Sequence, residues 1–188
     1  MARLAVATGN AGKLEEFREL LASTGFVLEG WAPDVAEDRD SYEGNAVLKA
    51  EAAAAACGLP ALGDDSGVEV DALGGFPGLH SARIAPTQPE RNRLLLSRLE
   101  GVPRPWTGRF VCVLALAVPG RPVRTFTGVR EGELTSPRGS DGFGYDPLFL
   151  IPSLGLTFGE LPAEEKHRWS HRGAAVRALL ESGALDEL

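Results

Sequence analysis

Lysine is scarce in this chain of 188 residues. Only three of its 19 basic residues are lysines, namely Lys13, Lys49 and Lys166, and all the others are arginines. The two side chains serve equally well for solubility, but a compact ammonium fits a single phosphate oxygen, whereas the planar guanidinium suits bidentate contacts. Codon bias would leave a few lysines at chance positions. Each of the three has Gly, Asn, Asp, His or Ser nearby, which favours a functional role.

Cysteine and long apolar runs are scarce as well. Cys57 ends an alanine-rich stretch and Cys112 lies in an apolar run, so both are predicted to be small buried side chains rather than metal ligands. No apolar run approaches the roughly 20 residues that cross a bilayer, and no signal-peptide pattern opens the sequence. We therefore expect a cytoplasmic protein without a membrane partner.

A basic stripe is also missing. The net charge is −7 and the arginines are scattered, so the electrostatic footprint of a nucleic-acid-binding protein is absent. A small anionic molecule remains possible as a ligand if cations gather locally or a metal ion supplies charge. The length predicts a single domain over residues 1–188 with a proper core.

The pattern of apolar residues predicts an α/β fold with a mixed sheet. Helices are expected just after the glycine turn at residues 9–12, over 45–57, over 89–99 and from Ser170, which would be the N-cap. Strands are expected at 3–8, 26–31, 61–71, 107–118, 122–134 and 147–151. The strand over 61–71 should be interrupted at 64–67, and the two long strands should form an antiparallel hairpin.

The first motif with chemical content is the turn TGNAGK. It follows a strand and opens a helix, so backbone N–H groups and the positive end of the helix dipole converge beside Lys13. This pattern predicts an anion site. The spacing excludes a Walker A loop, because Gly9 and Lys13 are too close and Leu14 replaces the hydroxyl residue. The alternative is an ordinary glycine turn with a surface lysine.

The second motif is GDDSG, in which Asp64 and Asp65 stand side by side. Neighbouring strand residues point to opposite faces, so one carboxylate should face a cleft while backbone groups hold the other. A carboxylate at such a position suits a divalent cation, with a second one from the acidic loop at 34–40. The alternatives are a capping or turn role for the pair and a fully solvated loop.

The third motif is DGFGYD, followed later by EEKHRWSHRG. Its glycines would let the chain approach a ligand closely, Phe143 or Tyr145 offers a ring for a base, and Asp146 offers an acceptor. His171 and Arg172 could hold a phosphate or the polar edge of a base. Taken singly, such aromatic residues are more often part of a core, and such a His-Arg pair more often faces solvent.

These motifs, together with GNAVLKA and the run GDDSGVEVDALGGFPGLHSAR, occur in the order and at about the spacings of the inosine triphosphate pyrophosphatase family. The resemblance runs from Ala7 to beyond Arg172. It implies a mixed twisted central sheet with helices on both sides and two lobes that enclose a deep substrate cleft. It further implies a homodimer, dependence on Mg²⁺, and hydrolysis of ITP, dITP or XTP to the monophosphate and pyrophosphate.

The resemblance also assigns roles to residues of this chain. Asp65 would accept a proton from water and bind the metal ion together with Glu37, and Lys13 would assist catalysis. The residues of the turn that would bind phosphates are Thr8, Gly9, Asn10, Ala11, Gly12 and Lys13. Further substrate contacts would come from Lys49, Ser66, Arg83, Phe143, Gly144, Tyr145, Asp146, Lys166, His171 and Arg172.

The sequence departs from the family at two positions. Gly44 stands where many members have a glutamate, and His80 stands where a tyrosine is common, so no metal role is supported at Gly44. Three other functions stay open on the sequence alone: a pyrophosphatase for modified pyrimidine nucleotides, a nucleotide sensor without turnover, and a plain interaction protein.

Overall fold

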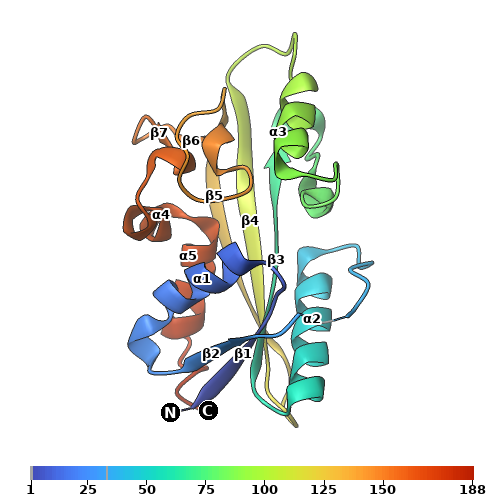
Figure 1. Ribbon diagram of the computed structural model, residues 1–188, viewed down its shortest axis with the longest axis vertical. Helices are drawn as coiled ribbons and strands as arrows, with labels where there is room; N and C mark the ends of the chain where they lie inside the picture. Colours follow the sequence, from blue (N-terminus) through green and yellow to red (C-terminus); the bar gives the residue numbers. More distant parts are fainter. Residues whose placement is uncertain (1, 33) are drawn as a thin grey trace. The chain divides into compact units, whose positions relative to one another are not determined.

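The computed structural model describes residues 2–32 and 34–188 (Figure 1). Seven strands form one sheet in the order β2-β1-β3-β4-β5-β6-β7. The strands are β1 (Arg3–Ala7), β2 (Val27–Gly30), β3 (Ala61–Val70), β4 (Trp106–Ala117), β5 (Arg124–Leu134), β6 (Phe149–Ile151) and β7 (Leu156–Thr157). The helices are α1 (Ala11–Leu20), α2 (Tyr42–Cys57), α3 (Gln88–Ser97), α4 (Ala163–Trp169) and α5 (His171–Glu181).

The sheet is mixed, as the sequence predicts. Strands β2 and β3 are both parallel to β1, whereas β6 is antiparallel to β5 and to β7. Strands β4 and β5 are neighbours joined by a short turn, in which the Arg121 N–H donates to the Val118 carbonyl. The α/β class is therefore confirmed.

The chain divides into two compact units. The first contains the residues up to Asp65, Cys112–Gly128 and Arg172–Leu188, and the second contains Ser66–Val111 and Val129–His171. Strands β3, β4 and β5 each supply residues to both units. The expected single domain and the substrate cleft between two lobes stay predictions.

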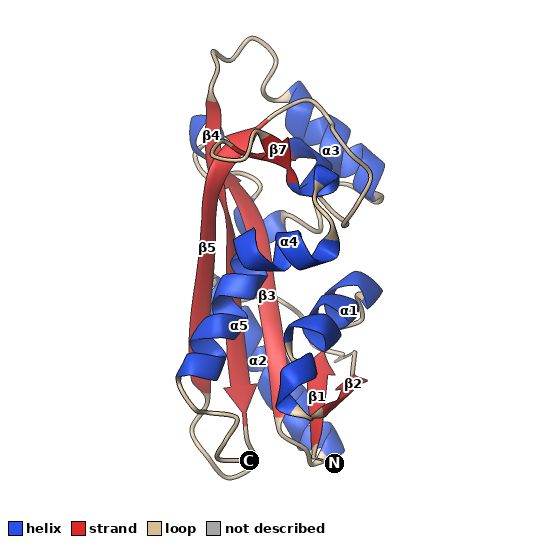
Figure 2. Cartoon of the chain, turned by 90° about the vertical axis from the view of Figure 1, so that its left-hand side faces the viewer, coloured by secondary structure: helices blue, strands red, loops and turns tan. Residues whose placement is uncertain are grey.

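In the first unit, helices cover both faces of the sheet. Phe17 of α1 and Val176 of α5 belong to one buried cluster with Leu4, Leu62 and other strand residues. Helix α2 covers the opposite face (Figure 1), and Figure 2 shows α5 in front of these strands and α2 behind them. Both faces of β1 and β3 are therefore buried under helices.

The alanine run of α2 allows its backbone to lie close to β3. A Cβ added at Gly63 would stand 2.1 Å from the Ala46 carbonyl oxygen and 2.7 Å from the Ala50 nitrogen. Ala46, Ala50 and Ala53 are fully buried. Small side chains on both elements are therefore required for this contact, which holds α2 firmly against the strand.

The second unit has its own core. Val68 of β3, Leu95 of α3 and Phe110 of β4 join one buried cluster with Phe149 and Phe158. Among these, Phe110 and Phe149 have ring centroids 4.4 Å apart. Phenylalanine side chains in such tilted contacts supply much of the apolar burial of a small unit.

The structure differs most clearly from the predicted elements in β3, in α2, at residues 146–148 and in α4. Strand β3 runs without interruption through 64–67, because both aspartates are satisfied by side chains from helices and the ladder need not break. Helix α2 begins three residues earlier, capped by the Ser41 hydroxyl, which accepts from the Gly44 N–H. Residues 146–148 form a 3₁₀ turn, and helix α4 was not predicted because only seven residues separate Pro162 from Ser170.

No helix in the described parts of the chain has the length and apolarity that crossing a membrane requires.

Candidate functional site

Two neighbouring carboxylates of β3 are the centre of the candidate site. Asp64 is 2% exposed and Asp65 is 7% exposed. They extend to opposite faces of the strand, since Asp64 meets side chains from α1 and α5 whereas Asp65 meets side chains from α2. The alternation predicted from the sequence is therefore present. Neither carboxylate is held by backbone groups in the contacts described, which corrects that part of the prediction.

Asp64 is surrounded by cations. Its Oδ1 accepts from Lys13 Nζ, and its Oδ2 lies 3.3 Å from Arg172 Nε and 3.1 Å from the thiol of Cys112. Burial alone would raise the pKa of Asp64, but the charges of Arg172, Lys13 and Lys49 outweigh it and hold that pKa far below the usual range. Asp64 is therefore a permanent anion that orients Lys13.

Glu16 is a site residue that the sequence analysis missed. Its Oε2 accepts from Arg172 Nη1 at 2.5 Å, and both side chains are buried. Glu16 lies one turn after Lys13 on α1, whereas Arg172 is 156 positions further along the chain. No local pattern predicts this pair. The only signal in the sequence is that Glu16 stands three residues after Lys13, on the same face of the predicted helix.

Asp65 has milder partners. Its Oδ2 accepts from Asn45 Nδ2 at 3.0 Å, and its Oδ1 lies 3.4 Å from Lys49 Nζ. Burial raises the pKa of Asp65, and the charge of Lys49 and the Asn45 hydrogen bond offset that effect only in part, so the pKa is raised overall. The two adjacent carboxylates thus have pKa values displaced in opposite directions, the pattern typical of a site that needs one fixed anion and one proton acceptor.

Lys49 connects Asp65 to the acidic loop. Its Nζ lies 3.1 Å from Glu37 Oε2 as well as near Asp65, so one ammonium contacts both carboxylates. Burial lowers the pKa of Lys49, but the charges of Asp65, Asp64 and Glu37 outweigh it and raise the pKa. Lys49 therefore stays charged.

The carboxylates of Glu37 and Asp65 are the type of ligand that a divalent cation such as Mg²⁺ prefers. Mg²⁺ usually takes one or two carboxylates and fills its other positions with water and substrate phosphates. Glu37 and Asp65 already share one cation, the Lys49 ammonium, so their oxygens converge. In the described ranges, no group of three or more His, Cys, Asp or Glu side chains could hold a metal ion by itself. A site completed by a ligand's phosphates agrees with this donor set.

The glycine turn is ordered by its own side chains. The Asn10 side chain caps α1 by accepting from the Lys13 N–H at 3.1 Å, and the Thr8 hydroxyl accepts from the Asn10 N–H at 3.0 Å. Gly9 and Asn10 are exposed, and Lys13 is directed to Asp64. The expected strand, turn and helix are confirmed, and anion binding there stays a prediction.

The DGFGYD loop of the second unit is organised by Asp146. Its Oδ2 accepts from the buried Lys166 Nζ at 2.6 Å and from the Phe143 N–H at 2.8 Å. Lys166 Nζ also lies 4.6 Å from the centroid of the Phe143 ring. Gly142 has φ +72° and leaves no room for a Cβ, which would stand 2.1 Å from Asp146 Oδ2. The loop therefore encloses an ion pair, and three predicted site residues lie together.

Comparison with known proteins gives the family. The model of the Ham1 family matches residues 4–182. The chain belongs to the Ham1 family. A protein of Symbiobacterium thermophilum named dITP/XTP pyrophosphatase is 49% identical and covers 95% of this chain and 93% of its own. A protein of the same name from Thermus thermophilus is 50% identical, with coverage of 96% and 91%.

Solved structures agree with this assignment to the Ham1 family. The structure of a HAM1 protein from Coxiella burnetii has a TM-score of 0.86 and 38% identity, with full coverage of both chains. The Ham1 protein of Staphylococcus aureus has a TM-score of 0.84 and 34% identity, covering 99% of this chain and 100% of that one. The expected likeness to the inosine triphosphate pyrophosphatases thus leads to a family whose named relatives act on dITP and XTP.

The other predicted site residues of this Ham1 chain have structural contacts of their own. His171 is buried and stacks on Phe110, with ring centroids 4.6 Å apart. The Tyr145 hydroxyl donates to the Ser81 carbonyl at 2.6 Å, and burial raises the pKa of Tyr145 to about 12. Arg83 is exposed. Substrate contacts at these residues, at Ser66 and at Gly144 stay predictions.

The two departures from the family pattern have different surroundings. Gly44 is closely packed, since a Cβ there would stand 2.9 Å from the Arg39 Cβ. A side chain at this position would push the acidic loop away from α2. His80 is exposed at the end of a 3₁₀ turn, and nothing in the structure explains it.

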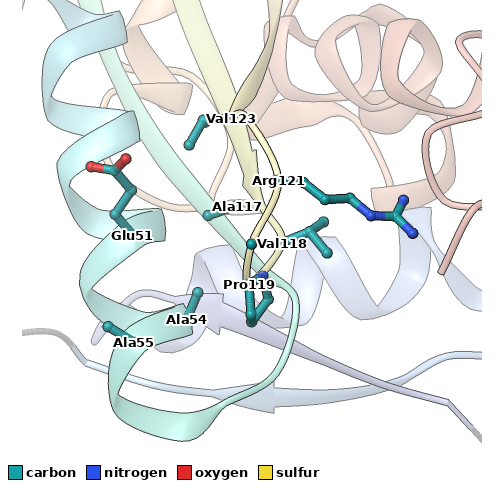
Figure 3. A pocket seen from close by; sticks show the side chains of 9 residues that line it. Glu51, Ala54, Ala55, Ala117, Val118, Pro119, Arg121 and Val123 are labelled. Atoms are coloured by element: carbon teal, nitrogen blue, oxygen red, sulfur yellow. The ribbon is translucent and has the colours of Figure 1, made fainter.

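A shallow pocket in the first unit lies at the other end of α2 (Figure 3). It measures about 260 Å³ and is lined mostly by alanines of α2 and by the turn between β4 and β5. Its charged side chains are Glu51 and Arg121, and Arg121 pairs with Glu187 at 3.5 Å. None of the predicted site residues lines it, so it is separate from the carboxylate pair.

Proposed function

We propose that this Ham1 protein is a nucleoside triphosphate pyrophosphatase that hydrolyses dITP, XTP and ITP to the monophosphate and pyrophosphate, with Mg²⁺ as cofactor. The observation that carries the proposal is the pair Asp64 and Asp65, two adjacent buried carboxylates with oppositely displaced pKa values beside two lysines. The names of relatives about 50% identical over nearly the whole chain support the choice of substrates.

Asp65 is the proton acceptor in this proposal. Its raised pKa makes it a better base than an exposed aspartate. Oδ2 is hydrogen bonded to Asn45, so Oδ1, which contacts Lys49 in the free protein, is the oxygen that would take the proton from the attacking water. Asp64 cannot take this role, because its surrounding cations keep its pKa far below the range in which it would accept a proton.

The cationic side chains hold the triphosphate. Lys13 lies in the first turn of α1, directly after the glycine turn, and Asp64 holds its ammonium. Glu37 and Asp65 would hold Mg²⁺, which neutralises phosphate charge when bound. Lys49, which contacts both carboxylates in the free protein, would then be the cation that binds a phosphate oxygen. Preorganised charge of this kind usually supplies the largest share of rate enhancement.

The DGFGYD loop would receive the base. Phe143 offers its ring, and Lys166 and Asp146 form the floor of the loop beneath it. A purine with a 6-keto group can accept hydrogen bonds from donors of His171 or Arg172 or from loop N–H groups, whereas adenine presents an amino group there. Binding of adenine would leave these buried donors without acceptors, which is costly. Discrimination of ~10⁴ in kcat/KM between 6-keto purine nucleotides and ATP is therefore attainable. A homodimer in the cytoplasm completes the proposal.

Incubation of the full chain with ITP, XTP, ATP or dUTP and Mg²⁺ in H₂¹⁸O tests this function. We expect ITP and XTP to give pyrophosphate and ¹⁸O-labelled monophosphate, with ATP and dUTP far slower. Label in orthophosphate with a diphosphate product would exclude attack at the α-phosphorus. Preference for dUTP would indicate a pyrimidine enzyme, and binding without turnover would indicate a nucleotide sensor.

A further inference from the structure

Asn45 contacts two parts of the candidate metal site at once. Its Nδ2 donates to Asp65 Oδ2 at 3.0 Å, and its Oδ1 accepts from the backbone N–H of Arg39 at 3.1 Å. The side chain is fully buried. One amide therefore connects β3 to the loop that carries Glu37, two residues before Arg39.

The connection divides the two oxygens of Asp65 between neighbouring residues of one helix face. Asn45 and Lys49 stand four positions apart on α2, so both side chains lie on the side that meets Asp65. Asn45 occupies Oδ2, whereas Lys49 contacts Oδ1 and Glu37. The orientation of the carboxylate is thereby fixed with Oδ1 toward Glu37.

We propose that Asn45 is a positioning residue that holds Asp65 and the Glu37 loop together, so that the free protein presents the two carboxylates as a ready pair for a divalent cation. The inference rests on the proposed function, because the metal ion belongs to it. Asn suits the task because its side chain is both a donor and an acceptor. Aspartate would lack the donor, and leucine would lack both while keeping similar bulk.

Removal of a hydrogen-bond partner behind a metal ligand typically costs 10–100-fold in metal affinity. We therefore expect Asn45→Leu and Asn45→Ala to weaken Mn²⁺ binding to the nucleotide-free protein by ~10-fold or more. The measurement is free Mn²⁺ by electron paramagnetic resonance during titration. The control is Ser41→Ala, which removes the cap of α2 but touches neither carboxylate, and should stay within ~2-fold because loss of a cap acts on helix stability.

A second pair of variants avoids the buried position altogether. Arg39→Pro deletes the backbone N–H that donates to Asn45 Oδ1, whereas Arg39→Ala removes the same exposed side chain and keeps that N–H. We expect Mn²⁺ affinity several-fold weaker in Arg39→Pro than in Arg39→Ala. This comparison decides the matter even if the Asn45 variants do not fold.

Three results would overturn the inference: unchanged Mn²⁺ affinity in folded Asn45 variants, equal affinity in the two Arg39 variants, or absence of Mn²⁺ binding to the wild-type protein without nucleotide. Nucleotide turnover by the wild-type protein is measured separately. If turnover is present and any of these results is found, the positioning role fails while the proposed function stands.

Discussion

Asparagine substitutions at Asp64 and Asp65 should have opposite consequences, although the residues are neighbours. Asp64→Asn should lower stability strongly, because Asp64 pairs with the buried Arg172 and with the half-buried Lys13. Asp65→Asn should leave stability unchanged or higher and abolish most activity. The contrast follows from the opposite displacement of their pKa values.

The size of the first effect can be derived from the contacts of Asp64. Its removal leaves Arg172, which is 2% exposed, and Lys13 without their shared anion. Removing one partner of a buried ion pair costs ~3–5 kcal/mol. Glu16 still pairs with Arg172, so we take the lower end, about 3 kcal/mol. For a chain of this length that loss lowers Tm by roughly 6–12 °C.

For Asp65, the expected effect of the asparagine substitution on stability has the opposite sign. Its pKa is higher in the folded than in the unfolded protein, so its contribution is fully present below the unfolded value of about 4 and is lost as pH rises through the folded value. Asp65 therefore costs stability once the pH exceeds these values, and Asn, which carries no charge at any pH, removes that cost. Loss of a general base lowers kcat by ~10²–10⁴.

The assay is thermal unfolding from pH 3.5 to 8 in EDTA, which keeps metal ions from the carboxylates, together with ITP turnover in Mg²⁺. The gain in Tm of Asp65→Asn over wild type should grow as pH rises above about 4, because Asp65 loses its proton less readily in the folded than in the unfolded protein. A lower Tm for Asp65→Asn than for Asp64→Asn at pH 7 would refute the reasoning from burial and charge. A near-normal kcat in Asp65→Asn would mean that another group accepts the proton.

Two further substitutions test other parts of the structure. Lys13→Arg keeps the charge but not the compact ammonium, and a loss of ~2 kcal/mol in transition-state stabilisation would lower kcat/KM roughly 30-fold. Arg93→Lys, at an exposed position of α3, should leave kcat/KM unchanged. Equal turnover in both variants would mean that lysine is not required at position 13. Gly63→Ala places a Cβ against the Ala46 carbonyl and should lower the free energy of unfolding in urea by ~1–3 kcal/mol or more, so an unchanged denaturation midpoint would show that α2 does not need its close approach to β3.

The elements that carry the first unit's site were predictable because their signals are local. A short apolar run, a glycine turn and an apolar helix face indicate β1, the turn and α1, and the alternation within a strand separates Asp64 from Asp65. The alanines of α2 indicate a close approach. Helix α4 was not predicted because it is short and a single residue separates it from α5. The two helices therefore give no separate periodic patterns of apolar residues.

The partners of the carboxylates were not predictable, because they depend on tertiary contacts. Arg172 reaches Asp64 across 108 positions only because α5 packs on the same face of the sheet as α1. That packing brings two strong cations to Asp64, whereas α2 brings one amide and one lysine to Asp65 on the other face. Strand alternation thus makes two neighbours different, but which of them becomes the fixed anion depends on the helices. In this chain, the cations from α1 and α5 make the carboxylate on their side the fixed anion, which leaves the carboxylate facing α2 as the proton acceptor that we propose.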